Sequence, residues 1–250
     1  PSSTQGVSSA ASDVYKRQYQ FNSPAEVDAM LDGPMGQQLL AKLEEKGLVG
    51  LGFWEIGFRN LTNSKRPIEK WEDLKGLKIR TVQSPIFRTF FEHLGANAQP
   101  MPINEVFGAL EMHAIDGQEN PISLIATQRL NEVQKYLSLS EHIYTAYVLL
   151  MSKKTWDSLD DAQRAQVRKA AEQARAEQRE LARKANSEKL AELKDSGMQV
   201  NALSNEQRQR FVDQAKVVTE QVSGSIDADF VSAWQACLLY TSPSPRDQRG

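Results

Sequence analysis

Short apolar runs alternate along this chain with longer segments in which apolar and polar residues are mixed. Residues 48–54 (LVGLGFW) are one such apolar run, which is typical of a buried strand in a parallel sheet. We expect a second strand over residues 77–82. A serine and a proline at positions 84 and 85 then predict a helix start, and Gly95 predicts its end. This alternation of strand and helix predicts an α/β fold.

The rest of the chain continues this pattern as far as the long helix described below. Pro34 and Gly47 punctuate a helix in the way that prolines at helix starts and glycines after helix ends usually do. The other expected elements are a polar connection over residues 59–68, a short helix over 104–112, a sharp turn over 114–121, a helix over 123–133, and two strands over 136–140 and 145–152.

A charged, alanine-rich segment over residues 160–196 predicts a helix roughly 55 Å long. Alanine, glutamine and arginine occupy many positions where a heptad repeat needs apolar residues, which favours a helix lying across a globular body over a coiled coil. Ser204 and Gln207 have the spacing of a capping box and predict a last amphipathic helix.

Composition limits the possible partners. The 250 residues are 40% hydrophobic and 25% charged, which is enough for a sizeable core. A formal net charge of −2 gives no basic surface for nucleic acid or for a membrane. No apolar run approaches the roughly 20 residues that span a bilayer, so we expect no direct membrane insertion.

Both ends of the chain resemble translated sequencing adaptors. Residues 8–18 (SSAASDVYKRQ) and 237–247 (CLLYTSPSPRD) back-translate to the two complementary forms of one transposase adaptor end. We therefore expect residues 1–18 and 237–250 to be non-native, and a missing signal peptide to carry no information. The only cysteine, Cys237, lies in the second segment, so we expect no disulfide or thiol chemistry in the native part.

Arg80 is the first candidate for binding chemistry. It ends an expected strand shortly before a serine-capped helix, where α/β sheets place ligands and helix N-termini favour anions. A guanidinium there can bind a carboxylate through two parallel hydrogen bonds, although an internal ion pair or a solvent-facing position is the alternative. Asn120, held before Pro121, either presents its amide to a ligand or caps a helix.

Two further candidates for ligand binding also have purely structural alternatives. Arg59 lies in the expected polar connection, from which it reaches an anion or remains an exposed loop arginine. Trp54 either stacks on a ligand or fills the core.

The sequence favours no catalytic chemistry and no cofactor. Its three histidines lack the spacing of metal ligands, and it has no motif of a nucleophile elbow, a phosphate loop or a dinucleotide-binding turn. Glu55, Asp116 and Glu119 lack a partner of opposite acid–base role, so we expect surface or hinge roles for them. We therefore expect a protein that is not an enzyme.

Four segments together carry a family resemblance: GFRNLTNSKRPI, DLKGLKIRTVQSP, LGANAQPMPINEVFGALE and DGQENP. In this order and spacing the chain resembles the DctP-like solute-binding proteins of tripartite ATP-independent periplasmic (TRAP) transporters, over nearly all of residues 19–236. The resemblance implies a periplasmic protein that captures a small organic carboxylate and delivers it to the TRAP membrane permease subunits.

The resemblance also implies an architecture, namely a two-lobed α/β binding protein of the type II-like class with a long helix spanning both lobes. Lobe I would be a remnant, comprising residues 19–57 and 146–185 and lacking its N-terminal part. Lobe II would comprise residues 58–145 and 186–236.

The resemblance implies roles for individual residues as well. Arg80 matches the family's carboxylate clamp, Asn120 a ligand-contacting amide and Arg59 a second cationic contact. Gln83, Met101 and Ile103 match positions that line the pocket. His113 stands where the family often has glycine.

The sequence leaves the ligand open among C4-dicarboxylates, sugar acids and keto acids. The main alternative function is a ligand-binding sensor domain of the same fold. An enzyme acting on an organic acid and a scaffold built around the long helix have less support.

Overall fold

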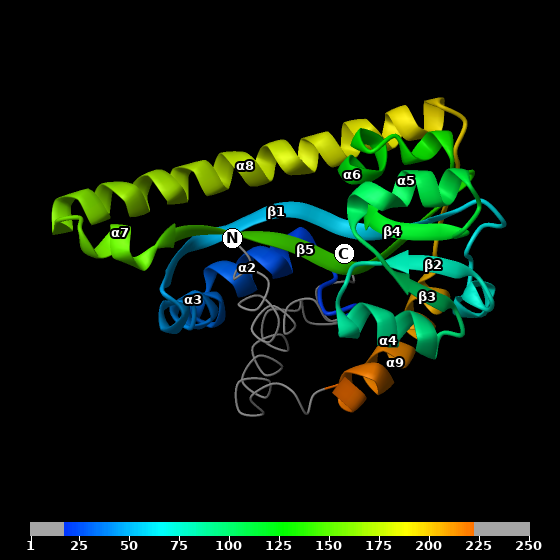
Figure 1. Ribbon diagram of the computed structural model, residues 1–250, viewed down its shortest axis with the longest axis horizontal. Coiled ribbons are helices and arrows are strands. Elements are labelled where there is room, and N and C mark those ends of the chain that lie inside the picture. The colour runs from blue at the N-terminus through cyan, green and yellow to red at the C-terminus, as the bar shows by residue number, and fades with distance from the viewer. Residues whose placement is uncertain (1–17, 223–250) are drawn as a thin grey trace, which may run out of the picture.

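The computed structural model describes residues 18–222, which form one six-stranded sheet flanked by helices (Figure 1). The strand order is β3-β2-β4-β1-β5-β6. Strand β2 is parallel to β3 and β4, β5 is parallel to β6, and β1 is antiparallel to β4 and β5. The strands are β1 Leu48–Asn63, β2 Lys78–Thr81, β3 Asn97–Pro100, β4 Gly117–Pro121, β5 Tyr136–Ser152 and β6 Gln199–Ala202.

The helices confirm the predicted α/β class. They are α2 Pro24–Asp32, α3 Pro34–Ala41, α4 Pro85–His93, α5 Ile103–Glu111, α6 Ile122–Thr127, α7 Lys153–Asp157, α8 Asp161–Asp195 and α9 Asn205–Val222, with 3-10 turns at Glu44–Lys46, Trp71–Leu74 and Leu130–Glu132. The long helix α8 follows β1 and β5 along the length of the molecule (Figure 1). Within residues 18–222, no helix combines the length and the apolar character needed to cross a membrane.

The two ends interpreted as adaptor sequence, including Cys237, lie outside the described residues except for Gln18. This side chain is buried and donates a hydrogen bond to the carbonyl of Ile86 over 3.2 Å.

Strands β1 and β5 are longer than the strands that the sequence predicted. Strand β1 continues through residues 59–63, so the polar connection begins later than the predicted residue 59. Residues 136–140 and 145–152 belong to the single strand β5, which pairs with β1 from one end to the other. At Glu141 the chain takes a φ of +45°, and its backbone N–H donates to Asn60 Oδ1 over 3.2 Å. This bond satisfies the irregular position and lets the strand continue.

Strand β4 occupies the sheet interior where the sequence suggested only a turn. All five of its residues are buried, and most of them are polar, so their composition gave no strand signal. The helix expected over residues 123–133 ends early, since Arg129 has a φ of +55° and a 3-10 turn follows. The helix starts at Pro85 and Asp160 agree with expectation, and Asp160 caps α8 by accepting from the Gln163 N–H over 2.8 Å.

The hydrophobic core consists of separate clusters at different positions along the β1–β5 pair. One cluster packs α2 and α3 against these strands through Met30, Leu31, Phe53 and Tyr144. At the other end, one cluster packs α4 and α9 on the sheet, and another joins α5 and α6 to the last turns of α8. Strands β1 and β5 therefore connect regions that bury their own apolar surface.

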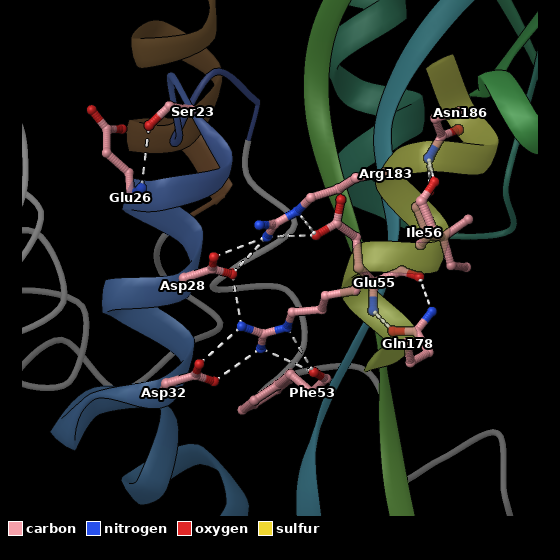
Figure 2. A network of polar contacts seen from close by, with 12 residues as sticks. Ser23, Glu26, Asp28, Asp32, Phe53, Glu55, Ile56, Gln178, Arg183 and Asn186 are labelled. Carbon is pink, nitrogen blue, oxygen red and sulfur yellow. Dashed lines mark hydrogen bonds and ion pairs between the residues drawn. The ribbon is translucent and has the colours of Figure 1, made fainter. Parts of the chain in front are cut away.

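Helix α8 covers a strand edge that no other described strand covers. Before residue 59, the edge of β1 away from β5 has no strand partner among residues 18–222. Gln178 instead accepts from the Glu55 N–H and donates to the Glu55 carbonyl, each over 2.7 Å. Arg179 donates to the Phe53 carbonyl over 3.0 Å. Figure 2 shows Gln178 beside Glu55. Side chains of a helix thus satisfy backbone groups that a neighbouring strand would otherwise bind.

The same face of α8 forms ion pairs with α2. Arg179 lies 2.7 Å from Asp28 and 2.9 Å from Asp32, and Arg183 lies 2.7 Å from Asp28 and 2.8 Å from Glu55. The Arg179 side chain is only 7% exposed. These pairs fix the middle of α8 to α2 and β1.

We expect Arg179→Ala to lower the free energy of unfolding by about 2–3 kcal/mol, between the values for exposed and buried ion pairs, because it leaves two aspartates and a carbonyl without their donor. Urea denaturation measures this loss. Arg88→Ala is the control, since Arg88 is 59% exposed and, within residues 18–222, pairs with Glu92 alone; its expected cost is below about 0.5 kcal/mol. Equal losses in the two variants would contradict a stabilising role for the buried pairs.

Candidate functional site

The polar candidates meet where β1, β2 and β4 lie side by side. The strand register places Arg80 of β2 next to Gln118 of β4, and Asn120 follows two residues later on the same strand. The register also pairs Arg59 of β1 with Pro121. Because β2 and β4 are parallel, their carboxyl ends share one edge of the sheet, which is where α/β sheets place ligands.

Arg80 is buried, and a backbone carbonyl holds one side of its guanidinium. The Met101 carbonyl accepts from Arg80 Nε over 2.9 Å and from Nη2 over 2.6 Å. Prolines on both sides of Met101 restrict this segment. Arg80 Nη1 is buried and has no hydrogen-bond partner within residues 18–222. The end of the guanidinium formed by Nη1 and the second Nη2 hydrogen therefore remains able to bind a pair of oxygens.

The charge of Arg80 persists at neutral pH. Burial lowers its pKa to about 10, the nearby Glu119 opposes this change, and Arg59 adds to it. Arg80 therefore presents a positive charge that the protein only partly compensates.

Arg59 is buried rather than exposed in a loop, so the loop alternative is wrong. Its Nε donates to the Glu119 carboxylate, and its Nη2 donates to Glu119 Oε1 over 2.8 Å and to Asn120 Oδ1 over 3.0 Å. The ring of Phe87 lies 5.4 Å from its guanidinium carbon. Arg59 thus neutralises one carboxylate and orients the Asn120 amide, because a buried charge needs a partner.

Glu119 and His142 complete this buried cluster. Glu119 is fully buried and Glu55 is 5% exposed, so a surface position is wrong for both. Burial alone would raise the pKa of Glu119, but Arg59 and His142 more than offset this effect and the pKa is lowered. His142 Nε2 lies 3.2 Å from Glu119 Oε2 and its Nδ1 lies 2.8 Å from Ser140 Oγ. Burial lowers the pKa of His142, with Glu119 opposing.

The Asn120 amide is fixed from its other side by a chain of hydrogen bonds. Its Nδ2 donates to Gln118 Oε1, and Gln118 Nε2 donates to Thr62 Oγ1 over 2.8 Å. Thr62 Oγ1 in turn donates to Gln134 Oε1 over 2.8 Å. The orientation of the amide is therefore set before any ligand binds.

The other predicted residues lie at different distances from this cluster. Gln83 and Ser84 lie two and three residues after the end of β2, and the Ser84 hydroxyl is buried without a partner among the described residues. Met101 contributes its carbonyl, and Ile103 begins α5 with 38% of its surface exposed. Trp54 lies five residues before Arg59 on β1, roughly 16 Å along an extended strand. The pocket-lining roles of Gln83, Met101 and Ile103 and the stacking role of Trp54 stay predictions.

Sequence reasoning missed Glu119 and His142 as members of the site. Glu119 stands directly beside Asn120 within DGQENP. The signal that could have found it is the need of a buried arginine, Arg59, for a carboxylate partner. His142 lies in a segment between two expected strands, where no local pattern indicates burial.

Comparisons with known proteins identify the family of this chain. Residues 3–224 match the family model DctP, described as "Bacterial extracellular solute-binding protein, family 7". The chain belongs to this family.

Three relatives show the range of the family around this chain. The 2,3-diketo-L-gulonate-binding periplasmic protein YiaO of Escherichia coli is 38% identical over 202 residues, covering 77% of this chain and 62% of YiaO. The C4-dicarboxylate-binding periplasmic protein DctP of Rhodobacter capsulatus is 33% identical over 229 residues, covering 90% and 67%. The crystal structure of the sugar acid binding protein DctPAm of Advenella mimigardefordensis in complex with galactonate has a TM-score of 0.87 at 39% identity, covering 93% and 75%.

The match is partial in length. The chain spans 55% of a relative from Haemophilus influenzae and 57% of a solute-binding protein from Verminephrobacter eiseniae. The family and its fold are therefore shown for this chain, whereas the function of a whole relative is not.

The buried His142 predicts a loss of stability on acidification. Because its pKa is lowered in the folded state, the unfolded chain binds more protons as the pH falls below the ordinary value of 6.5. The lowered pKa of Glu119 acts in the same direction at more acidic pH. We expect the free energy of unfolding to decrease from about pH 7 to about pH 5, and to decrease less in His142→Gln, whose amide can still donate to Glu119.

Urea denaturation at a series of pH values measures this dependence. Identical slopes for the wild type and His142→Gln below pH 6.5 would contradict the assignment of His142 as a buried, neutral histidine.

Proposed function

We propose that this chain is the solute-binding component of a TRAP transporter, that it binds a small organic carboxylate in the periplasm, and that it delivers this ligand to the membrane permease subunits without converting it. The observation that carries the proposal is Arg80, a buried arginine whose side edge is held by a backbone carbonyl and whose Nη1 has no partner among the described residues. A buried guanidinium in this state is suited to a carboxylate.

The proposed mode of binding follows from the directions that remain open around Arg80. One ligand oxygen accepts from Nη1 and the other from the second hydrogen of Nη2, so the carboxylate approaches the guanidinium end-on. The nine-residue helix α4 begins just after this strand, and its N-terminus adds a favourable partial charge. Asn120, already oriented by Arg59 and Gln118, contributes its remaining hydrogen-bonding capacity.

This proposal changes the part played by Arg59. Its charge is matched by Glu119, so it orients Asn120 and holds the cluster together rather than acting as a second free cation. The described part of the site therefore offers one incompletely matched positive charge, which suits one carboxylate group.

Ligand closure is part of the proposal. We take residues 19–57 and 146–185 as one lobe and residues 58–145 and 186–236 as the other, with β1 and β5 passing between them. Closure by rotation of two rigid parts about such connecting strands is a common way for proteins to enclose a ligand. The separate hydrophobic clusters at the two ends of β1 and β5 support this division.

The ligand class is proposed from relatives and from the site together. DctPAm, at 39% identity, carries galactonate in its crystal structure, and YiaO, at 38% identity, is named for 2,3-diketo-L-gulonate. We therefore propose sugar acids as the first ligands to test, with C4-dicarboxylates second because DctP is 33% identical.

The test is a thermal-shift and calorimetric screen of galactonate, 2,3-diketo-L-gulonate, succinate and neutral galactose. It uses this chain and a chimera that adds the region of DctPAm outside the match. A ligand at 100 times its Kd should stabilise the native state by about 2.7 kcal/mol. We expect an acid to bind and galactose to fail.

We expect Arg80→Ala to weaken binding of that acid at least about a hundredfold, since it removes one partner of a desolvated charge pair. Arg88→Ala is the matched control, because this arginine lies eight residues later in the same strand–helix unit and is exposed. Binding by Arg80→Ala within a few-fold of wild type would rule out the proposed carboxylate contact.

A further inference from the structure

Asn186 of helix α8 bonds to two chain segments that are distant in sequence. Its Nδ2 donates to the Ile56 carbonyl of β1 over 2.8 Å, and its Oδ1 accepts from the Ser123 N–H at the start of α6 over 2.9 Å. Figure 2 shows Asn186 directed at Ile56. A single amide thus uses both its donor and its acceptor to hold β1 and α6 against one helix.

These two segments carry residues of the proposed binding site. Ile56 lies three residues before Arg59, and Ser123 lies three residues after Asn120. Arg59 and Asn120 also bond to each other, with Nη2 and Oδ1 3.0 Å apart. Asn186 therefore holds together, through their backbones, the same two segments whose side chains Arg59 and Asn120 meet in the site.

Close packing leaves Asn186 little freedom. Gly57 has a φ of +116°, and a Cβ added there would lie 2.8 Å from Asn186 Nδ2. Only glycine adopts this backbone conformation readily and admits the amide at this distance.

The helix is anchored on both sides of Asn186. On its N-terminal side, Arg179 and Arg183 pair with α2 and β1. On its C-terminal side, Leu190 and Leu193 belong to the hydrophobic cluster of α5 and α6. Asn186 is thus the point on α8 where contacts with one end of the molecule give way to contacts with the other.

We propose that Asn186 is a positioning residue for the ligand site, which sets the alignment of Arg59 with Asn120 by holding Ile56 and Ser123 together. This inference rests on the proposed function. Asn186 contacts no part of the ligand and acts only through the two segments.

The experiment compares Asn186→Ala with Gln178→Ala. Gln178 is the matched control, because it too lies on α8 and makes two hydrogen bonds to the β1 backbone, but both go to Glu55 and none reaches α6. Asn186→Asp is a second variant that keeps the acceptor for Ser123 and loses the donor for Ile56.

The first measurement needs no ligand and uses this chain as it is. The Arg59 Nε–H and Asn120 side-chain amide signals are followed by NMR. We expect both signals to move in Asn186→Ala and Asn186→Asp and to stay in place in Gln178→Ala. Unchanged signals in the two Asn186 variants, or equal changes in the control, would overturn the proposal.

The second measurement is calorimetric binding of the acid found in the screen. We expect Asn186→Ala to weaken binding about tenfold, Gln178→Ala to change it less than about twofold, and the two variants to lose similar amounts of thermal stability. Equal affinities in these variants would overturn the positioning role while leaving the carboxylate site intact. If the wild type binds no acid, the proposed function fails, and the NMR comparison still decides whether Asn186 aligns the two side chains.

Discussion

Strands β1 and β5 pair over their whole length, from Leu48 opposite Ser152 to Asn63 opposite Tyr136, and the other elements are arranged around this ladder. Each end of it is covered by a different hydrophobic cluster, so the two ends are connected through the backbone hydrogen bonds of this ladder, whose register shifts at three places. Helix α8 follows the ladder and binds it through side chains rather than through backbone. Bends in the ladder are confined to a few irregular positions, such as those at Gly57 and Glu141.

The electrostatics of the site follow from where this ladder buries charge. Arg59 enters the interior because β1 continues past Trp54, and an arginine there needs a carboxylate, which Glu119 supplies from the neighbouring strand. Arg80 enters the interior as well, but a carbonyl rather than a carboxylate holds it. One arginine is thus compensated by a carboxylate, and the Nη1 of the other has no partner among the described residues.

The sequence predicted the parts of this protein whose signals are local. Pro85, Asp160 and Ser204 mark helix starts through caps and ring geometry, which depend on a few neighbouring residues, and all three helices begin there. Strand β4 escaped prediction because its polar residues are buried by strands from elsewhere in the chain, and no local pattern records that burial. Position alone left Arg80 and Asn120 with structural alternatives, and the family resemblance made them site candidates, whereas Glu119 and His142 become visible only once the sheet brings them to Arg59.

The way in which Arg80 is held has a consequence for how such a site can diversify. Its guanidinium rests on a main-chain oxygen between two prolines, so its placement depends on the course of the backbone and not on the identity of the side chain at position 101. We therefore expect a larger, smaller or more polar side chain at position 101 to leave the guanidinium in place. Side chains that select the ligand can therefore change in evolution while the proposed carboxylate contact of Arg80 is kept.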